Sequence, residues 1–164
     1  MTAPIDPRHF RTVLGHLPTG VVVVAGLDAS GAPHGLTIGS FVSISLDPPL
    51  VGFFPGLNSG SWRAVSPTGK FCVNVLADGQ DELCWRFARE SEDRFAGIEW
   101  TPNSDGLPEL AGCIANIVCS VHSESEVGDH LFVVGLVESL DHIDNAGDAM
   151  AFYRGKVTRA VAAD

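Results

Sequence analysis

Hydroxyl and glycine residues interrupt a stretch that otherwise reads as β-strand, residues 35–51 (GLTIGSFVSISLDPPLV). Thr37, Gly39, Ser40 and Ser43 stand where a strand packed on a core would carry Val, Ile or Phe. A strand that lets a flat ligand lie against its backbone lacks large side chains there. Thr37 and Ser40 are an odd number of residues apart, so both meet one ligand only if the strand bends near Gly39. The stretch therefore predicts either a ligand platform or a solvent-exposed strand face.

A second concentration of hydroxyls and flexible backbone follows, in the sequence NSGSW. Asn58, Ser59 and Ser61 come just before Trp62, where a short helix is predicted to begin. Backbone N–H groups at helix N-termini and in nests attract anions, so this cluster suits a phosphate group. An ordinary polar loop is the alternative interpretation.

Two more polar residues have both a structural and a ligand-binding interpretation. Asn74 lies inside the apolar run FCVNVL, where a buried amide needs hydrogen-bond partners from either the backbone or a ligand. His130 follows Asp129 at the end of a turn, which is typical of a surface histidine as well as of a binding one. The chain has no G-x-S-x-G, G-x-G-x-x-G or Walker motif, so a nucleophilic triad is not indicated.

Hydrophobic periodicity predicts a mainly β protein of one domain, residues 1–164. A helix is expected to begin after an Asp6 N-cap, with apolar residues at helical spacing from Phe10 to Leu17. Further helices are expected after Trp62, over residues 78–89 and over 145–153. Strands are expected over residues 21–24, 35–47, 50–54 and 70–77, with an antiparallel hairpin of 114–124 and 130–143. These strands favour a closed antiparallel β-barrel with a few peripheral helices, because closure removes exposed sheet edges.

Composition narrows the partners and the compartment. The chain of 164 residues has a formal net charge of -10, which disfavours nucleic acid and anionic membrane surfaces. Without an apolar signal core or a run of about 20 apolar residues, the protein is expected to be cytoplasmic. The four cysteines form no C-x-x-C pair and are expected to be buried free thiols.

Several segments taken in order resemble the flavin reductase-like family, which includes the reductase components of two-component flavin-dependent monooxygenases. They are PTGVVVV, GLTIGSFVSISLDPPLVGF, NSGSW, FCVNVL, DRFAGIEW and GDHLFVVGLVESL, and they span most of the chain from Phe10 to Arg154. The resemblance implies an FMN-binding split β-barrel, usually a homodimer with two flavin sites near the subunit interface. It also implies an NAD(P)H-dependent flavin reductase that passes a hydride from NADH or NADPH to FMN or FAD and supplies reduced flavin to an oxygenase.

The resemblance also implies where the cofactors bind. The flavin ring is expected by Thr37 to Phe41, its phosphate or ribityl chain by Ser59, Ser61 and Trp62, and the nicotinamide nucleotide by His130 and residues 153–156. No protein residue is expected to act as a catalytic group, since the hydride passes between cofactors. The predicted cofactor-binding residues are Thr37, Ile38, Gly39, Ser40, Phe41, Ser43, Phe53, Phe54, Asn58, Ser59, Ser61, Trp62, Asn74, Val75, Phe87, His130, Tyr153, Arg154 and Gly155.

Two other functions remain open at this point. One is a flavin-binding or haem-binding protein on the same barrel without free-flavin reductase activity. The other is a structural dimer without a ligand, against which the hydroxyl-rich strand and Asn74 argue.

Overall fold

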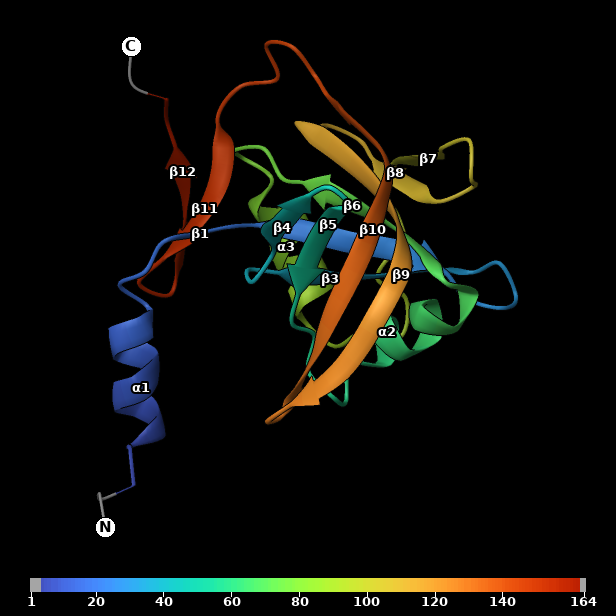
Figure 1. The fold of residues 1–164 in the computed structure, drawn as a ribbon. Coiled ribbons are helices and arrows are strands. Elements are labelled where there is room, and N and C mark those ends of the chain that lie inside the picture. Colours follow the sequence, from blue (N-terminus) through green and yellow to red (C-terminus); the bar gives the residue numbers. More distant parts are fainter. Residues whose placement is uncertain (1–3, 163–164) are drawn as a thin grey trace.

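The computed structural model describes residues 4–162 and is built around one antiparallel sheet of seven strands. Figure 1 shows this sheet curling into a barrel, with the long β9–β10 hairpin across its front. Across the sheet the order is β3 (Pro33–Ile38), β2 (Val22–Leu27), β6 (Lys70–Val75), β9 (Ala115–Val127), β10 (His130–His142), β5 (Pro49–Phe53) and β4 (Val42–Leu46). The predicted fold, an antiparallel split barrel with few helices, is confirmed.

Smaller elements surround the barrel. A three-stranded sheet has the order β1 (Thr19–Gly20), β11 (Ala149–Tyr153), β12 (Lys156–Ala160), and a two-stranded one pairs β7 (Trp100–Pro102) with β8 (Pro108–Leu110). The helices are α1 (Pro7–Leu14), α2 (Gly60–Val65), the 3-10 helix η1 (Ser66–Thr68) and α3 (Asp81–Ala88). No helix in the described part of the chain has both the length and the apolar character needed to cross a membrane.

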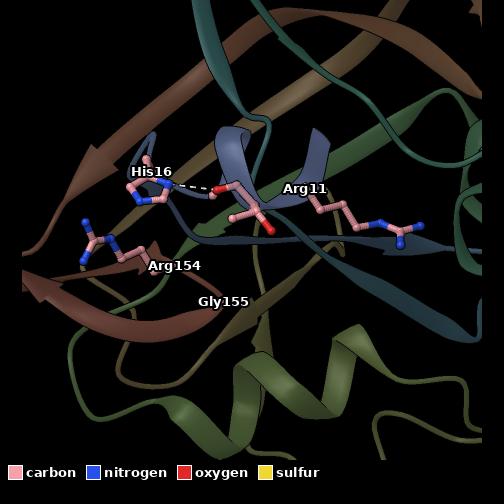
Figure 2. Close-up of a pocket in the computed structure, with 6 residues that line it drawn as sticks. Arg11, His16, Arg154 and Gly155 are labelled. Atoms are coloured by element: carbon pink, nitrogen blue, oxygen red, sulfur yellow. Dashed lines mark hydrogen bonds between the residues drawn. The ribbon is translucent and has the colours of Figure 1, made fainter. Parts of the chain in front are cut away.

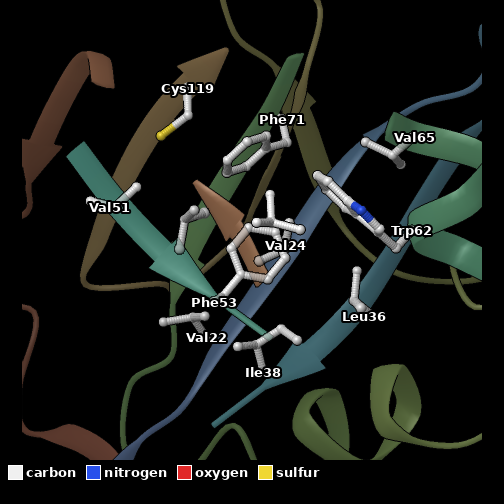
Figure 3. Packing of buried hydrophobic residues seen from close by; sticks show 12 residues of the cluster. Val22, Val24, Leu36, Ile38, Val51, Phe53, Trp62, Val65, Phe71 and Cys119 are labelled. Carbon is white, nitrogen blue, oxygen red and sulfur yellow. The ribbon is translucent and has the colours of Figure 1, made fainter. Parts of the chain in front are cut away.

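The barrel interior is an aromatic core closed at one end by α2. The Phe53 ring meets Trp62 edge-on at 5.0 Å and Phe71 at 5.5 Å between ring centroids. Figure 3 shows these side chains converging from β5, α2 and β6. Gly135 makes the packing possible, because a Cβ there would stand 2.6 Å from a carbon of the Phe71 ring.

A second core lies on the outside of β2, under α3. Val22 and Val24 point into the barrel, whereas Val21 and Val23 pack with Phe87 of α3. Burial on both faces explains the run of valines, since a strand covered on both sides has no solvent face to carry polar residues.

Most predicted elements are present, one predicted strand is divided into two, and one predicted helix is wrong. Asp6 caps α1 through its carboxylate, which accepts a hydrogen bond from the His9 N–H at 3.0 Å. The predicted strand over residues 35–47 is two strands, β3 and β4, separated at residues 39–41. The predicted helix over residues 145–153 is instead strand β11, because its backbone pairs with β1 and β12. All four cysteines are buried free thiols, as predicted.

Candidate functional site

The break between β3 and β4 opens a recess of about 510 Å³ on the barrel surface. Gly39 is exposed there, and a Cβ at this position would stand 3.3 Å from the Thr19 hydroxyl. Bare backbone therefore lies at the surface of the recess, as expected for a platform under a flat ligand. The residues that line it are Leu17, Pro18, Thr19, Gly20, Gly39, Ser40, Phe41, Val42 and Phe54.

A smaller apolar recess of about 220 Å³ adjoins the first, and Gly39 lines both. Thr37 lines this smaller recess and Ser40 lines the larger one, and the strand is interrupted at Gly39 between them. The small recess is lined by Val21, Thr37, Gly39, Cys84, Trp85, Ala88 and Phe152.

The two hydroxyls have different hydrogen-bonding capacity left for a ligand. The Thr37 hydroxyl donates its proton to the Cys84 carbonyl at 2.6 Å, so only its oxygen lone pairs remain free. The Ser40 oxygen accepts a hydrogen bond from the Phe54 N–H at 3.0 Å, so its own O–H can still donate. The site can thus offer one acceptor and one donor to the edge of a heteroaromatic ring.

The NSGSW segment begins α2 as predicted. The Ser59 oxygen accepts a hydrogen bond from the Trp62 N–H at 3.3 Å, which makes Ser59 the N-cap. The Ser61 hydroxyl lies 2.5 Å from Nη1 of Arg94, a residue of the loop after α3.

Arg94 is the residue that sequence reasoning missed. Its guanidinium also donates to the carbonyls of Gly35 at 3.0 Å and Arg89 at 2.7 Å. Partial burial lowers the pKa of the guanidinium, the Glu90 carboxylate partly offsets this, and no carboxylate lies within ion-pair distance of it among residues 4–162. A half-buried cation without a carboxylate partner is costly, so this position favours an anionic ligand. In the sequence, the only signal for Arg94 is that it lies in the DRF segment of the family resemblance.

The side chains of three predicted aromatic contacts are buried. The side chains of Phe53, Trp62 and Phe87 are 0%, 1% and 1% exposed, and each packs in one of the two cores. They support the strands and helices of the site from behind and present no surface to a cofactor. Ile38 is likewise buried in the first core, and the partly buried Val75 packs against that core.

The Asn74 amide makes hydrogen bonds to other groups inside the protein. Its amide nitrogen donates to the carbonyls of Val23 at 3.4 Å and Pro108 at 3.2 Å. Its oxygen accepts hydrogen bonds from the Leu110 N–H and the Asn116 amide, both at 2.8 Å. Of the two interpretations, the structural one explains this residue, which ties β8 to β6.

The remaining predicted residues lie in three separate places. The His130 Nδ1 lies 2.7 Å from the Asp129 carboxylate. The turn that holds both residues contacts the segment before Asn58, because the Leu57 N–H donates to the Asp129 carbonyl. Tyr153, Arg154 and Gly155 lie at the β11–β12 turn, which Figure 1 shows well apart from the tip of the β9–β10 hairpin. Ser43 is exposed on the edge strand β4.

Comparison with known proteins now adds to this geometry. The family described as "Flavin reductase like domain" matches residues 14–160. The chain belongs to the flavin reductase-like family. The predicted family and the predicted enzyme class, an NAD(P)H-dependent flavin reductase, are therefore confirmed.

Individual relatives agree with this family assignment. The reductase subunit HsaB of a flavin-dependent monooxygenase from Rhodococcus jostii is 47% identical over 154 residues, 94% of this chain and 78% of that protein. Nitrilotriacetate monooxygenase component B from Mycobacterium thermoresistibile has 41% sequence identity to this chain. Its crystal structure matches the present one with a TM-score of 0.91, covering 95% of this chain and 87% of that one. The NADH:FAD oxidoreductase SgcE6 of Streptomyces globisporus, solved with NAD and FAD fragments, is 32% identical, with a TM-score of 0.87 over 98% of both chains.

Proposed function

We propose that the flavin ring binds over the Gly39 backbone, between Thr37 and Ser40, and that its phosphate binds at Ser59, Ser61 and Arg94. Arg94 carries this proposal, because it is a half-buried cation that lies against a predicted phosphate contact and has no carboxylate partner in the described chain. Arg94 also bonds to the Gly35 carbonyl of β3, the strand that ends at the Gly39 recess. One extended ligand, a ring joined to a phosphate by a flexible chain, suits two features placed along one strand.

The reaction belongs to the cofactors, since a hydride passes from the nicotinamide to the flavin when both are bound. The residues of this chain would orient the two rings. Thr37 and Ser40 fix the flavin edge through one acceptor and one donor. His130 and residues 153–155 are the proposed contacts of the nicotinamide nucleotide, as the family resemblance implies.

We further propose a homodimer, because two apolar surfaces have no cover from residues 4–162 of the same chain. Helix α1 buries none of its residues, although Phe10, Val13 and Leu14 form one apolar stripe. Figure 1 shows α1 standing away from the barrel, and a lone helix of eight residues is marginal in water. On the outer face of the barrel, Ile44 and Phe132 cross over Gly52 and remain partly exposed.

The oxygenase partner is proposed from the relatives. Their names include a monooxygenase reductase subunit, and a reductase of that kind must release its reduced flavin, which favours moderate flavin affinity. A cytoplasmic location is proposed with it, since free thiols are typical of reducing compartments.

A steady-state assay tests the proposed function. Oxidation of NADH or NADPH is followed by the absorbance of the reduced nicotinamide at about 340 nm, first with FMN and then with FAD added. We expect turnover with at least one of the four pairs and a strong dependence on free flavin. A protein that binds flavin yet oxidises neither nucleotide would instead be a binding module, and one that binds no flavin would contradict the whole assignment.

A further inference from the structure

The α3–β7 loop, residues 89–99, carries Arg94 from the end of α3 to β3 and α2. Within the part of the chain that the structure describes, the hydrogen bonds that join this loop to β3 and α2 all come from the Arg94 guanidinium, which donates to the Gly35 carbonyl and to the Ser61 hydroxyl oxygen. The position of that guanidinium therefore depends on how the loop itself is held.

Packing holds one side of the loop. The Phe95 side chain is buried in the second core, where its ring meets the Phe87 ring edge-on at 5.0 Å between centroids. Gly35 lets these rings come close to β3, because a Cβ there would stand 2.8 Å from the Phe87 ring and 3.4 Å from the Phe95 ring. The residue after Arg94 is thus fixed against the same strand to which Arg94 donates.

Arg86 of α3 holds the loop through its backbone carbonyls. The Arg86 Nε donates to the Arg94 carbonyl at 3.2 Å, and its Nη2 donates to the Ala96 carbonyl. The planar guanidinium thus spans the two residues on either side of Phe95. The Arg86 side chain is half-buried and forms no ion pair with a carboxylate among residues 4–162. It therefore stabilises the backbone of the loop.

The arginines at the two proposed cofactor contacts are held in different ways. Arg154, at the proposed nucleotide contact, lines an open recess together with Arg11 and His16 (Figure 2). Its guanidinium lies over the neighbouring Tyr153 ring, 5.1 Å from the ring centroid. Arg94 instead has its guanidinium held by β3 and α2 and its backbone held by α3. The proposed phosphate contact is therefore the more preorganised of the two.

The carboxylates nearest to Arg94 in sequence leave its guanidinium available for a ligand. The Asp93 carboxylate accepts hydrogen bonds from the Phe95 and Ala96 N–H groups, both at 3.0 Å. The Glu90 carboxylate raises the pKa of Arg94 and only partly offsets the lowering by burial, and it lies beyond ion-pair distance. A half-buried cation in this setting favours an anionic ligand.

We propose that Arg86 is a positioning residue for the flavin phosphate and acts through the α3–β7 loop. By donating to the Arg94 carbonyl, Arg86 keeps the Arg94 guanidinium against Ser61, where the phosphate is proposed to bind. The inference rests on the proposed function and adds a residue that does not itself contact the ligand. A preorganised arginine binds an anion more tightly than a flexible one, because less side-chain freedom is lost on binding.

The test measures FMN and riboflavin affinity by fluorescence titration in Arg86→Gln and in a control, Arg89→Gln. Both variants lose one charge near the C-terminal end of α3, but the Arg89 guanidinium lies over the Trp85 ring, 6.0 Å from its centroid. We expect Arg86→Gln to weaken FMN binding about tenfold and to change riboflavin binding by less than about twofold, because riboflavin has no phosphate. Arg89→Gln should change neither affinity.

A double-variant cycle separates positioning from direct contact. In an Arg94→Gln background, Arg86→Gln should weaken FMN binding by less than about twofold, because the guanidinium that Arg86 positions is already absent. A further loss of about tenfold would mean that Arg86 acts on the phosphate without Arg94, and would overturn the inference. Arg86→Lys keeps the charge but not the forked donor, and it replaces Arg86→Gln if that variant does not fold. It should weaken FMN binding about threefold.

The outcomes separate this inference from the proposed function. If Arg94→Gln weakens FMN binding and Arg86→Gln does not, the proposed phosphate site stands and the positioning role is overturned. Equal losses of FMN and riboflavin affinity in Arg86→Gln would also overturn it, since Arg86 would then support the fold as a whole. Unchanged FMN affinity in Arg94→Gln would contradict the proposed phosphate site itself, and this inference with it.

Discussion

Ser40 is the residue on which the placement of the flavin ring depends most directly. Its side chain lines the Gly39 recess, and its oxygen holds the Phe54 N–H. Ser40→Leu should fill the recess and raise the flavin dissociation constant at least tenfold, about 1.4 kcal/mol, in a fluorescence titration. Ser139→Leu, on the exposed end of β10, is the control and should leave flavin affinity unchanged. Wild-type affinity in a folded Ser40→Leu protein would move the ring elsewhere.

Arg94 is the residue on which the proposed position of the flavin phosphate depends. Arg94→Gln should weaken FMN binding about tenfold, as the loss of one charge-assisted contact would, and leave riboflavin binding unchanged because riboflavin has no phosphate. Arg63→Gln, on the exposed side of α2, provides a matched loss of charge close to the same helix start. An equal loss of affinity for FMN and riboflavin would show that Arg94 acts by packing rather than by charge.

The two residues differ in how far the sequence could predict them. Ser40 stands out because a hydroxyl and a glycine interrupt a strand, which is a local signal. Arg94 reaches Ser61 only because the loop after α3 folds back across 33 positions of sequence. Asn74 shows the converse, since a buried amide in a strand signals unusual hydrogen bonding but does not say whether a ligand or the backbone supplies it.

At the scale of elements, strand β10 comes close to the Phe71 ring of β6 at Gly135, where there is no side chain in the way. A Cβ at Gly135 would stand 2.6 Å from the Phe71 ring and 3.2 Å from the Cys119 Cβ. Gly135→Ala should therefore destabilise the fold by about 1–3 kcal/mol through overpacking, measured by urea unfolding. At Gly60, the first residue of α2, a Cβ meets nothing within 4 Å, so Gly60→Ala should change stability by less than about 0.5 kcal/mol. Equal stability of the two variants would mean that the barrel shifts to accept the methyl group.

Most elements carried a local sequence signal that predicted them, and one strand with a weak local signal was missed. The alternation of Phe71, Cys72 and Val73 and the β9–β10 hairpin follow from neighbouring residues alone. Strand β11 was wrongly expected as a helix: it pairs over five residues with the neighbouring β12 and over two residues with β1, which lies about 130 positions earlier. The Arg-Gly pair at 154–155 was a usable hairpin signal, weakened because type I′ turns usually carry Asn or Gly first.

At the scale of the whole molecule, the proposed homodimer would cover the two apolar surfaces that the described residues leave exposed. The α1 stripe and the outer face around Ile44 and Phe132 occur in the same chain, so a second copy can cover both reciprocally across a two-fold axis. The connector after α1 also lines the Gly39 recess, so seating α1 on the partner would fix one wall of the flavin site. Assembly and flavin binding should therefore be coupled.

This coupling gives the last prediction. Sedimentation at micromolar concentration should give about twice the 17.3 kDa mass of one chain. Phe10→Ser/Leu14→Ser should weaken dimerisation about a hundredfold, since losing the burial of each side chain costs about 1.5 kcal/mol or more. Flavin affinity should fall with it and recover as protein concentration rises. Arg8→Ser/His9→Ser, on the same helix but off the apolar stripe, should change neither property. A monomeric wild type that still reduces flavin would show that the site is complete within one chain and that α1 has another partner.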